Sequence, residues 1–172
     1  MKYLIPFLFI LVFAQCDAPA KKSQVKAEQP KIEAINWLDL EEAQNLNKKD
    51  PKEFFIFVHA DWCPHCKRIF KETLSNPKLI TEMNENFYPV LINAHEPKDL
   101  KFKEKVYGNP NYNPSLGLSG KNSYHEVIYA IEAQSIPAIV FLDKNLEING
   151  SEMGFKADDE LRGLMKMYSS SF

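Results

Sequence analysis

The stretch FFIFVHADWCPHCK, residues 54–67, decides the fold of this chain. Residues 54–59 form an apolar run, which predicts a strand buried on both faces of a sheet. A Cys-Pro-His-Cys motif follows at residues 63–66, and its proline suits the first position of a helix, where a missing N–H leaves no bond unmade. The motif therefore joins the end of a buried strand to the beginning of a helix.

The two cysteines of the motif have different positions and therefore different expected roles. Cys63 lies where the helix begins, and the helix dipole and free N–H groups there favour a thiolate, the nucleophile of disulfide exchange. Cys66 lies one turn further in and is placed to resolve a mixed disulfide at Cys63. We expect Cys63 and Cys66 to be catalytic, with their redox-active disulfide as the only cofactor. Trp62, Pro64 and His65 are expected to tune the pair, and Trp62 either packs beside the motif or shapes its contact surface.

A lone C-x-x-C spacing also occurs in zinc sites and in haem attachment. Lys67 follows the second cysteine, where haem attachment needs histidine, and a closed zinc site usually needs four ligands. The chain offers no second paired cluster, only four separate histidines: His59, His65, His95 and His125. We therefore expect no metal site, His59 as a packed core residue, and His95 and His125 as ordinary loop and helix residues. A purely structural disulfide is disfavoured because so short a loop constrains the unfolded chain little.

Helices and strands alternate around the motif. Asp39, with Glu42 three residues later, predicts a capping box at the start of a helix. The inner face of that helix is expected to consist of Leu40, Ala43 and Leu46. After the motif, residues 69–74 continue its helix, another helix begins at Pro77, and residues 87–92 form the next strand.

The second half of the chain begins with a loop at residues 108–123, rich in Gly, Asn, Pro and Ser. Ser123 and Glu126 predict a second capping box. The buried face of its helix is expected to be Tyr124, Val127, Ile128 and Ile131. A strand at residues 138–142, an edge strand at 147–155 and a closing amphipathic helix complete the pattern. The closing helix is marked by Leu161, Leu164, Met165 and Tyr168. This alternation predicts an α/β fold with helices on both faces of the sheet.

Two motifs carry a family resemblance: residues 60–67, ADWCPHCK, and residues 135–138, SIPA. With them the sequence resembles the thioredoxin superfamily over about residues 35–170. The resemblance implies a central mixed sheet flanked by helices, with Pro137 in the cis form facing the cysteines. It also implies that the main chain at Ile136 binds the substrate chain and that this loop keeps metals off the thiols.

More narrowly, the sequence is similar to exported thioredoxin-like lipoproteins of bacteria, which share a long connection before the cis-proline. Here Pro137 comes 74 positions after Cys63, which predicts an insertion before the following strand. We expect the connection at residues 97–135 to cover one side of the site and to narrow substrate choice. Phe57 departs from the family pattern, because thioredoxin has a buried acid there, and this leaves open which group accepts the proton of Cys66.

The resemblance implies a thiol–disulfide oxidoreductase that acts on other proteins, but two features indicate opposite directions. The dipeptide Pro64-His65 is typical of DsbA-like oxidants, whereas Ile136 before the proline is more typical of reductases. We expect a protein-disulfide reductase of intermediate potential. The alternatives are a DsbA-like disulfide-forming oxidase, a copper-binding module that uses the two thiolates, and a non-catalytic binding module.

The N-terminus is interpreted as a targeting segment rather than as part of the fold. Residues 1–15 combine one early lysine with an apolar run too short to span a bilayer, which is the pattern of a signal peptide. Cys16 follows directly, and this arrangement resembles a bacterial lipoprotein signal in which Cys16 would be lipidated. The alternative is an ordinary secretory signal cut near Ala18 or Ala20. Either interpretation predicts an exported protein of the cell envelope or periplasm.

The remaining chain is expected to hold a polar tether at residues 16–34 and one thioredoxin-like domain at residues 35–172. The formal net charge of −2 gives no attraction to nucleic acid. No long apolar segment follows the first 15 residues, so we expect membrane contact through the lipid anchor only. The expected partners are proteins with thiols or disulfides and a membrane thiol carrier, and the domain is expected to be a monomer.

Overall fold

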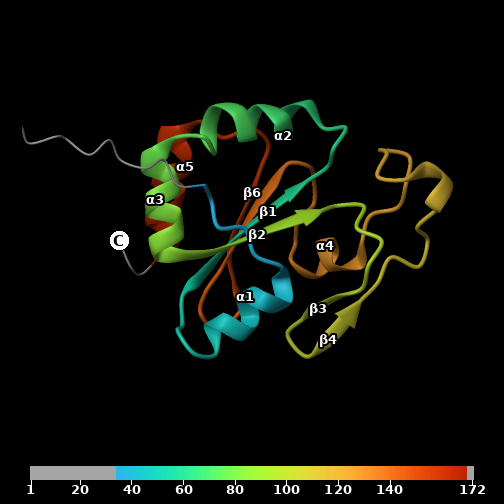
Figure 1. Ribbon diagram of the computed structural model, residues 1–172, viewed down its shortest axis with the longest axis horizontal. Helices are drawn as coiled ribbons and strands as arrows, with labels where there is room; N and C mark the ends of the chain where they lie inside the picture. The colour runs from blue at the N-terminus through green and yellow to red at the C-terminus, as the bar shows by residue number, and fades with distance from the viewer. Residues whose placement is uncertain (1–33, 170–172) are drawn as a thin grey trace, which may run out of the picture. The chain divides into compact units, whose positions relative to one another are not determined.

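The computed structural model describes residues 34–169, which contain a four-stranded mixed sheet of order β2-β1-β5-β6 (Figure 1). The strands are β1 (Glu53–His59), β2 (Phe87–Asn93), β5 (Ala138–Leu142) and β6 (Ile148–Met153). Strand β1 pairs in parallel with β2 and antiparallel with β5, and β5 pairs antiparallel with β6. The predicted thioredoxin fold, with a mixed sheet flanked by helices, is confirmed.

Strand β1 is buried on both faces, as its apolar run predicts. Phe54, Ile56 and Val58 belong to the hydrophobic cluster on one face of the sheet. Phe55 and Phe57 belong to the cluster on the other face. Successive side chains of a strand point to opposite faces, so both faces of this central strand contribute to a core.

Helices cover both faces of the sheet (Figure 1). One face carries α2 (Pro64–Arg68) with the π-helical turn that continues it (Ile69–Thr73), α3 (Pro77–Asn86) and α5 (Asp158–Tyr168). The other face carries α1 (Leu40–Asn47), α4 (Glu126–Ala130) and a small hairpin of β3 (Leu100–Phe102) and β4 (Lys105–Tyr107). The first face is the one that includes the two cysteines in its core.

The predicted inner face and cap of α1 are wrong in part. Asp39 occupies the cap position, but its side chain makes no capping bond, so the predicted capping box is absent. Leu40 and Ala43 are buried as predicted, whereas Leu46 is 39% exposed. Gln44 takes an inner position because its amide donates to the Lys101 carbonyl at 2.8 Å and accepts the Lys103 N–H at 2.7 Å. The helix therefore uses a polar side chain to hold the β3–β4 hairpin.

The predicted start of α4 is also wrong. His125, rather than Ser123, caps this helix, and its Nδ1 accepts the Val127 N–H at 3.1 Å. Its Nε2 donates to the Lys98 carbonyl at 3.1 Å, and burial lowers the pKa of His125. Ser123 and Glu126 cannot form the box because their side chains bind elsewhere, to Asn109 and to the Gly108 N–H. Tyr124, predicted to be buried, is 37% exposed.

Other differences concern short elements. The β3–β4 hairpin was not predicted, because three-residue strands give too little periodicity to recognise. The loop at residues 108–123 contains one short 3₁₀ turn, Pro114–Leu116. The edge strand is shorter than predicted, and the register of its pairing shifts at Phe141 and Leu142.

A bidentate ion pair joins α5 to α3 and supplies a test of the packing on the cysteine-bearing face. The Nε and Nη2 atoms of Arg162 each donate to a carboxylate oxygen of Glu82 at 2.7 Å. These hydrogen bonds lower the pKa of Glu82, and burial partly opposes them. A lowered carboxyl pKa stabilises the fold above the ordinary pKa of 4.5, and the contribution disappears as the pH falls through the lowered value.

Glu82→Gln is therefore expected to lower the melting temperature at pH 7 by about 2–4 °C. The difference from wild type should shrink as the pH falls well below 4.5, because wild-type Glu82 is then protonated too. Calorimetry across this pH range measures both effects. Glu85→Gln, on the exposed side of the same helix, is the matched control. Equal melting temperatures of the two variants at pH 7 would contradict the stabilising role of the Arg162–Glu82 ion pair.

Candidate active site

The register of the sheet brings three separate segments to one edge. Strands β1 and β2 run in parallel and both end there, with His59 opposite Asn93. Strand β5 runs the other way and begins with Ala138 opposite Val58, so Pro137 lies at this same edge. The cysteine motif, the residues after β2 and the proline loop therefore meet although they are far apart in sequence.

Cys63 and Cys66 form a disulfide with a Cα–Cα distance of 5.3 Å. Cys63 is the cap residue of α2, and Pro64 takes a first-turn position in that helix, as predicted. The Cys66 N–H points at the sulfur of Cys63 across 3.1 Å. Both cysteines are buried, because only 3% of Cys63 and 1% of Cys66 is exposed. The helix start thus places a hydrogen-bond donor on the sulfur of Cys63.

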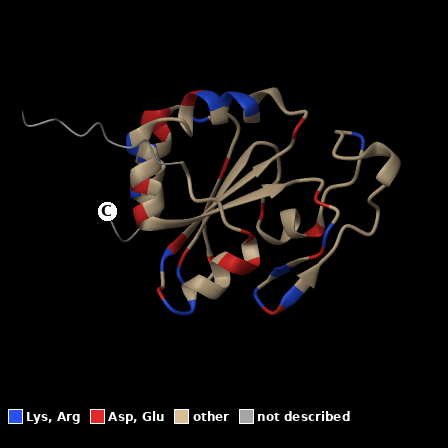
Figure 2. Ribbon diagram, in the orientation of Figure 1, with Lys and Arg blue, Asp and Glu red and all other residues tan. Residues whose placement is uncertain are grey.

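The outer side of α2 is basic. Figure 2 shows that lysine and arginine residues occur in this helix, and Lys67 and Arg68 are exposed. His65 is also exposed and lies one residue before Cys66. Its expected role, tuning the cysteine pair, stays a prediction.

Trp62 both packs beside the motif and remains accessible. Its Nε1–H donates to Nε2 of His95 at 3.0 Å, and the side chain is 43% exposed. A Cβ atom at Gly120 would lie 2.9 Å from Cε2 of Trp62, so the glycine permits close approach of the loop to the indole. The loop at residues 108–123 therefore reaches the residue next to Cys63.

His95 is the functional candidate that sequence reasoning missed. His95 lies in a turn, as predicted, but its side chain is fully buried and hydrogen-bonded to Trp62, which was not predicted. The only available signal was position: His95 comes two residues after the end of β2, which pairs in parallel with the strand before the motif. Parallel strands end at the same edge, so their following residues meet.

The proline loop has the geometry that the resemblance implies. The peptide bond between Ile136 and Pro137 is cis, and the Pro137 carbonyl accepts the Gly154 N–H at 2.9 Å. Ile136 packs against the cluster that contains both cysteines. Among residues 34–169, none forms a hydrogen bond with the main-chain N–H or carbonyl of Ile136.

Phe57 lies fully buried in the same cluster as Cys66, so the position of the family's acid holds an apolar ring. His59 follows on the same face of β1 and packs against the rings of Phe57 and Phe70, as a core histidine would. Burial lowers the pKa of His59, and the nearby Asp61 carboxylate partly opposes this. Lys67, which directly follows Cys66, is exposed on the outer side of α2.

Several expectations concern other kinds of site. Cys16, the signal peptide and most of the tether lie outside the described residues. Between residues 34 and 169, no three His, Cys, Asp or Glu side chains gather as metal ligands. In that same part of the chain, no helix has the length and apolar character needed to cross a bilayer.

The sequence matches the model of a family described as a thioredoxin-like domain over residues 40–167. The chain therefore belongs to the thioredoxin-like family. Among solved structures it is similar to a DsbH oxidoreductase, with 19% identity, a TM-score of 0.57, and coverage of 86% of this chain and 94% of the other. A thioredoxin from Thermus thermophilus has 16% identity, a TM-score of 0.57, and coverage of 78% and 87%. At these identities the structures show the shared fold.

Two curated sequences match shorter parts of the chain. One is a helicase/translocase subunit, XPB, of general transcription and DNA repair factor IIH from Dictyostelium discoideum, 33% identical over 111 residues, or 56% of this chain and 13% of that protein. The other is an uncharacterized protein from Archaeoglobus fulgidus, 29% identical over 62 residues, or 36% and 49%. The chain spans less than half the length of each.

The family and the Cys63–Cys66 disulfide together support a thiol–disulfide oxidoreductase.

Proposed function

We propose that this protein reduces disulfide bonds in other proteins of the cell envelope. The observation that carries the proposal is the Cys66 N–H directed at the sulfur of Cys63 at the start of α2. In the reduced protein, a donor at this position stabilises negative charge on Cys63 and so favours its thiolate. Cys63 is then the nucleophile, and Cys66 is the resolving cysteine.

The reaction is a pair of thiol–disulfide exchanges. The Cys63 thiolate attacks one sulfur of a substrate disulfide, a mixed disulfide forms, and the other substrate sulfur leaves as a thiolate that takes up a proton. The Cys66 thiolate then attacks the sulfur of Cys63 and releases the second substrate thiol. Two electrons pass to the substrate, the Cys63–Cys66 disulfide forms, and a membrane thiol carrier reduces it again.

The proline loop supports a protein as the substrate. The main-chain groups of Ile136 have no partner among residues 34–169, and they lie at the sheet edge where the motif begins. An extended substrate segment that pairs with Ile136 would be held with its cysteine near Cys63. We propose Ile136 and Pro137 as the substrate-binding residues of a monomeric enzyme.

The reducing direction is preferred because Ile136 precedes the cis-proline, a feature more typical of reductases in this family. The dipeptide Pro64-His65 favours the alternative, a DsbA-like disulfide-forming oxidase. The two features act on the same disulfide, so its reduction potential decides between them.

The cell-envelope location rests on residues 1–16, whose pattern is that of a lipoprotein signal. We propose export, lipidation of Cys16, and a tether that holds the domain near the membrane. Fractionation of cells tests this directly. Wild-type protein is expected in the membrane fraction, and Cys16→Ser is expected to leave it. An unchanged distribution in the variant would contradict lipidation.

The roles of the two cysteines are tested by single substitutions assayed with a folded disulfide-bonded protein and dithiothreitol as the electron source. Cys63→Ser is expected to abolish turnover, because it removes the attacking sulfur. Reduced Cys66→Ser, freed of dithiothreitol before it meets the substrate, is expected to accumulate a mixed disulfide between Cys63 and the substrate, visible as a covalent complex that added dithiothreitol releases. Turnover that survives in Cys63→Ser would overturn the mechanism.

The direction of electron flow is tested by equilibrating the pair with glutathione buffers. A reductase is expected to have a reduction potential nearer to that of thioredoxin, about −270 mV, than to that of DsbA, about −120 mV. Mass spectrometry after thiol trapping measures the oxidised fraction. A value close to that of DsbA would assign the protein to disulfide formation instead.

A further inference from the structure

The loop at residues 109–123 is held in one conformation by two nearly buried asparagines. The side-chain oxygen of Asn122 accepts the N–H groups of Asn113 and Ser123, each at 2.9 Å. Its amide nitrogen donates to the carbonyls of Asn113 and Gly117 at 2.9 and 2.7 Å. Asn109 closes the loop, because its side-chain oxygen accepts the Ser123 hydroxyl at 2.6 Å. A long loop bonded in this way presents a fixed surface.

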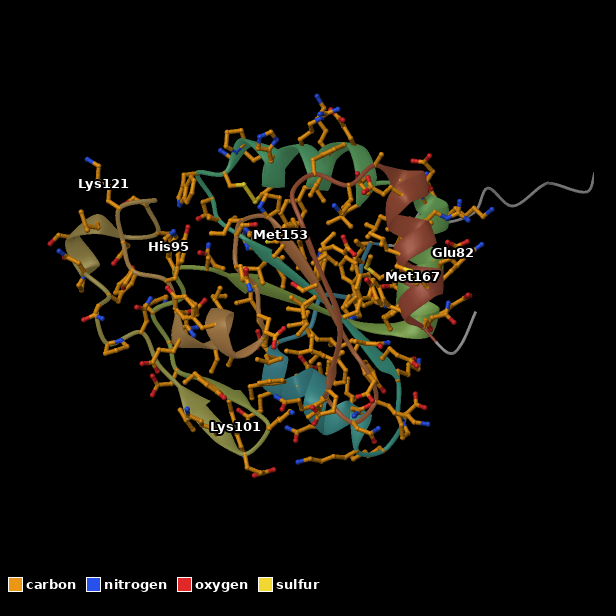
Figure 3. The ribbon with its side chains drawn as sticks, turned by 180° about the vertical axis from the view of Figure 1, so that it is seen from behind. Glu82, His95, Lys101, Lys121, Met153 and Met167 are labelled. Atoms are coloured by element: carbon orange, nitrogen blue, oxygen red, sulfur yellow. A yellow bond between two sulfur atoms is a disulfide. The ribbon has the colours of Figure 1, made fainter. Side chains whose placement is uncertain are left out.

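His95 connects this loop to Trp62. One ring nitrogen, Nδ1, lies 3.0 Å from the Ser123 carbonyl, and the other, Nε2, lies 3.0 Å from Nε1 of Trp62. The indole N–H can only donate and a carbonyl can only accept. The two bonds therefore assign a neutral ring with its proton on Nδ1 and its lone pair on Nε2. Figure 3 shows His95 where the loop meets the body of the domain, with Lys121 pointing outward from the loop.

The ring of His95 also lies between two accessible aromatic side chains. Its centroid is 6.0 Å from that of Trp62 and 5.0 Å from that of Tyr124. His95 itself is fully buried, whereas Trp62 and Tyr124 are 43% and 37% exposed. Trp62, the residue before Cys63, and Tyr124 thus flank the ring of His95, and we call these two accessible side chains the aromatic ledge. Gly120 lies against the indole of Trp62, because the absence of a side chain leaves room for the ring to contact the loop.

We propose that His95 is a positioning residue that fixes the aromatic ledge, and that this ledge selects substrates with an apolar side chain next to the reacting cysteine. The inference rests on the proposed function. A mixed disulfide ties the substrate to Cys63, so the residue flanking the substrate cysteine lies over the adjacent Trp62. Contact between an apolar side chain and a fixed aromatic surface removes apolar area of both from water, which favours binding. If the indole were mobile, binding would have to order it, and the lost conformational entropy would offset this gain.

The test compares two disulfide-linked peptides that differ only in the residue beside the cysteine, leucine or serine. Wild type is expected to prefer the leucine peptide in kcat/KM, mainly through a lower KM. His95→Leu keeps the bulk but removes both hydrogen bonds, and it is expected to reduce the leucine-to-serine preference about three- to tenfold. His95→Gln, whose amide can both donate and accept, is expected to restore most of the preference. Tyr129→Leu, at an exposed aromatic residue of α4 outside the ledge, is the matched control.

Fluorescence reports the position of Trp62 without relying on turnover. In a Trp37→Phe background, Trp62 is the remaining tryptophan. His95→Leu is expected to shift its emission to the red as the indole becomes more exposed, and His95→Gln should show a smaller shift. Unchanged emission in His95→Leu would overturn the positioning role. An unchanged preference in an active His95→Leu enzyme would overturn the selection. If wild type reduces neither peptide nor oxidised glutathione, the proposed function fails, and the emission result still decides whether His95 positions Trp62.

Discussion

The pairing of β1 with β2 on one side and β5 on the other is the constraint on which the site depends. Because β1 and β2 are parallel and β5 is antiparallel, the end of β1, the end of β2 and the beginning of β5 share one edge of the sheet. That edge receives the cysteine motif, His95 and the cis-proline loop. A slip of one residue would exchange the faces of β1 and turn Phe55 and Phe57 away from the cluster that contains the cysteines. The apolar residues on both faces therefore hold the register, and the register assembles the site.

The chemistry at this edge comes from the main chain more than from charged side chains. The Cys66 N–H reaches the sulfur of Cys63 because the chain turns into a helix there, and Pro64 suits that turn. Phe57 provides no titratable group beneath the pair. In the proposed function, the neighbouring residues would provide recognition: the main chain at Ile136, and the indole of Trp62 held by His95 and Gly120. The reacting sulfur and the surfaces that would select its substrate thus come from different parts of the fold.

The sequence predicted the features that local pattern determines, and missed those that depend on tertiary contacts. The central strand and the helix start after Cys63 were predicted because an apolar run and the cysteine motif mark them directly, and the cis-proline at Pro137 was implied by the family resemblance. The inner face of α1 was wrong at Leu46, since Gln44 is buried only because the distant β3–β4 hairpin supplies its partners. Ser123 does not cap α4 as predicted, because its hydroxyl donates a hydrogen bond to Asn109. His95 could not be recognised for the same reason, because its hydrogen-bond partners, Trp62 and Ser123, are distant in sequence.

The central claim is that the fold makes Cys63, and not Cys66, the reactive thiolate. The most direct measurement is the rate at which iodoacetamide alkylates each cysteine of the reduced wild-type domain near neutral pH, followed by mass spectrometry of the peptides. Since the thiolate is the reacting species, the structure predicts that Cys63 reacts at least about tenfold faster than Cys66. Equal rates, or faster reaction at Cys66, would contradict the assignment of the nucleophile and with it the account of how this sheet edge works.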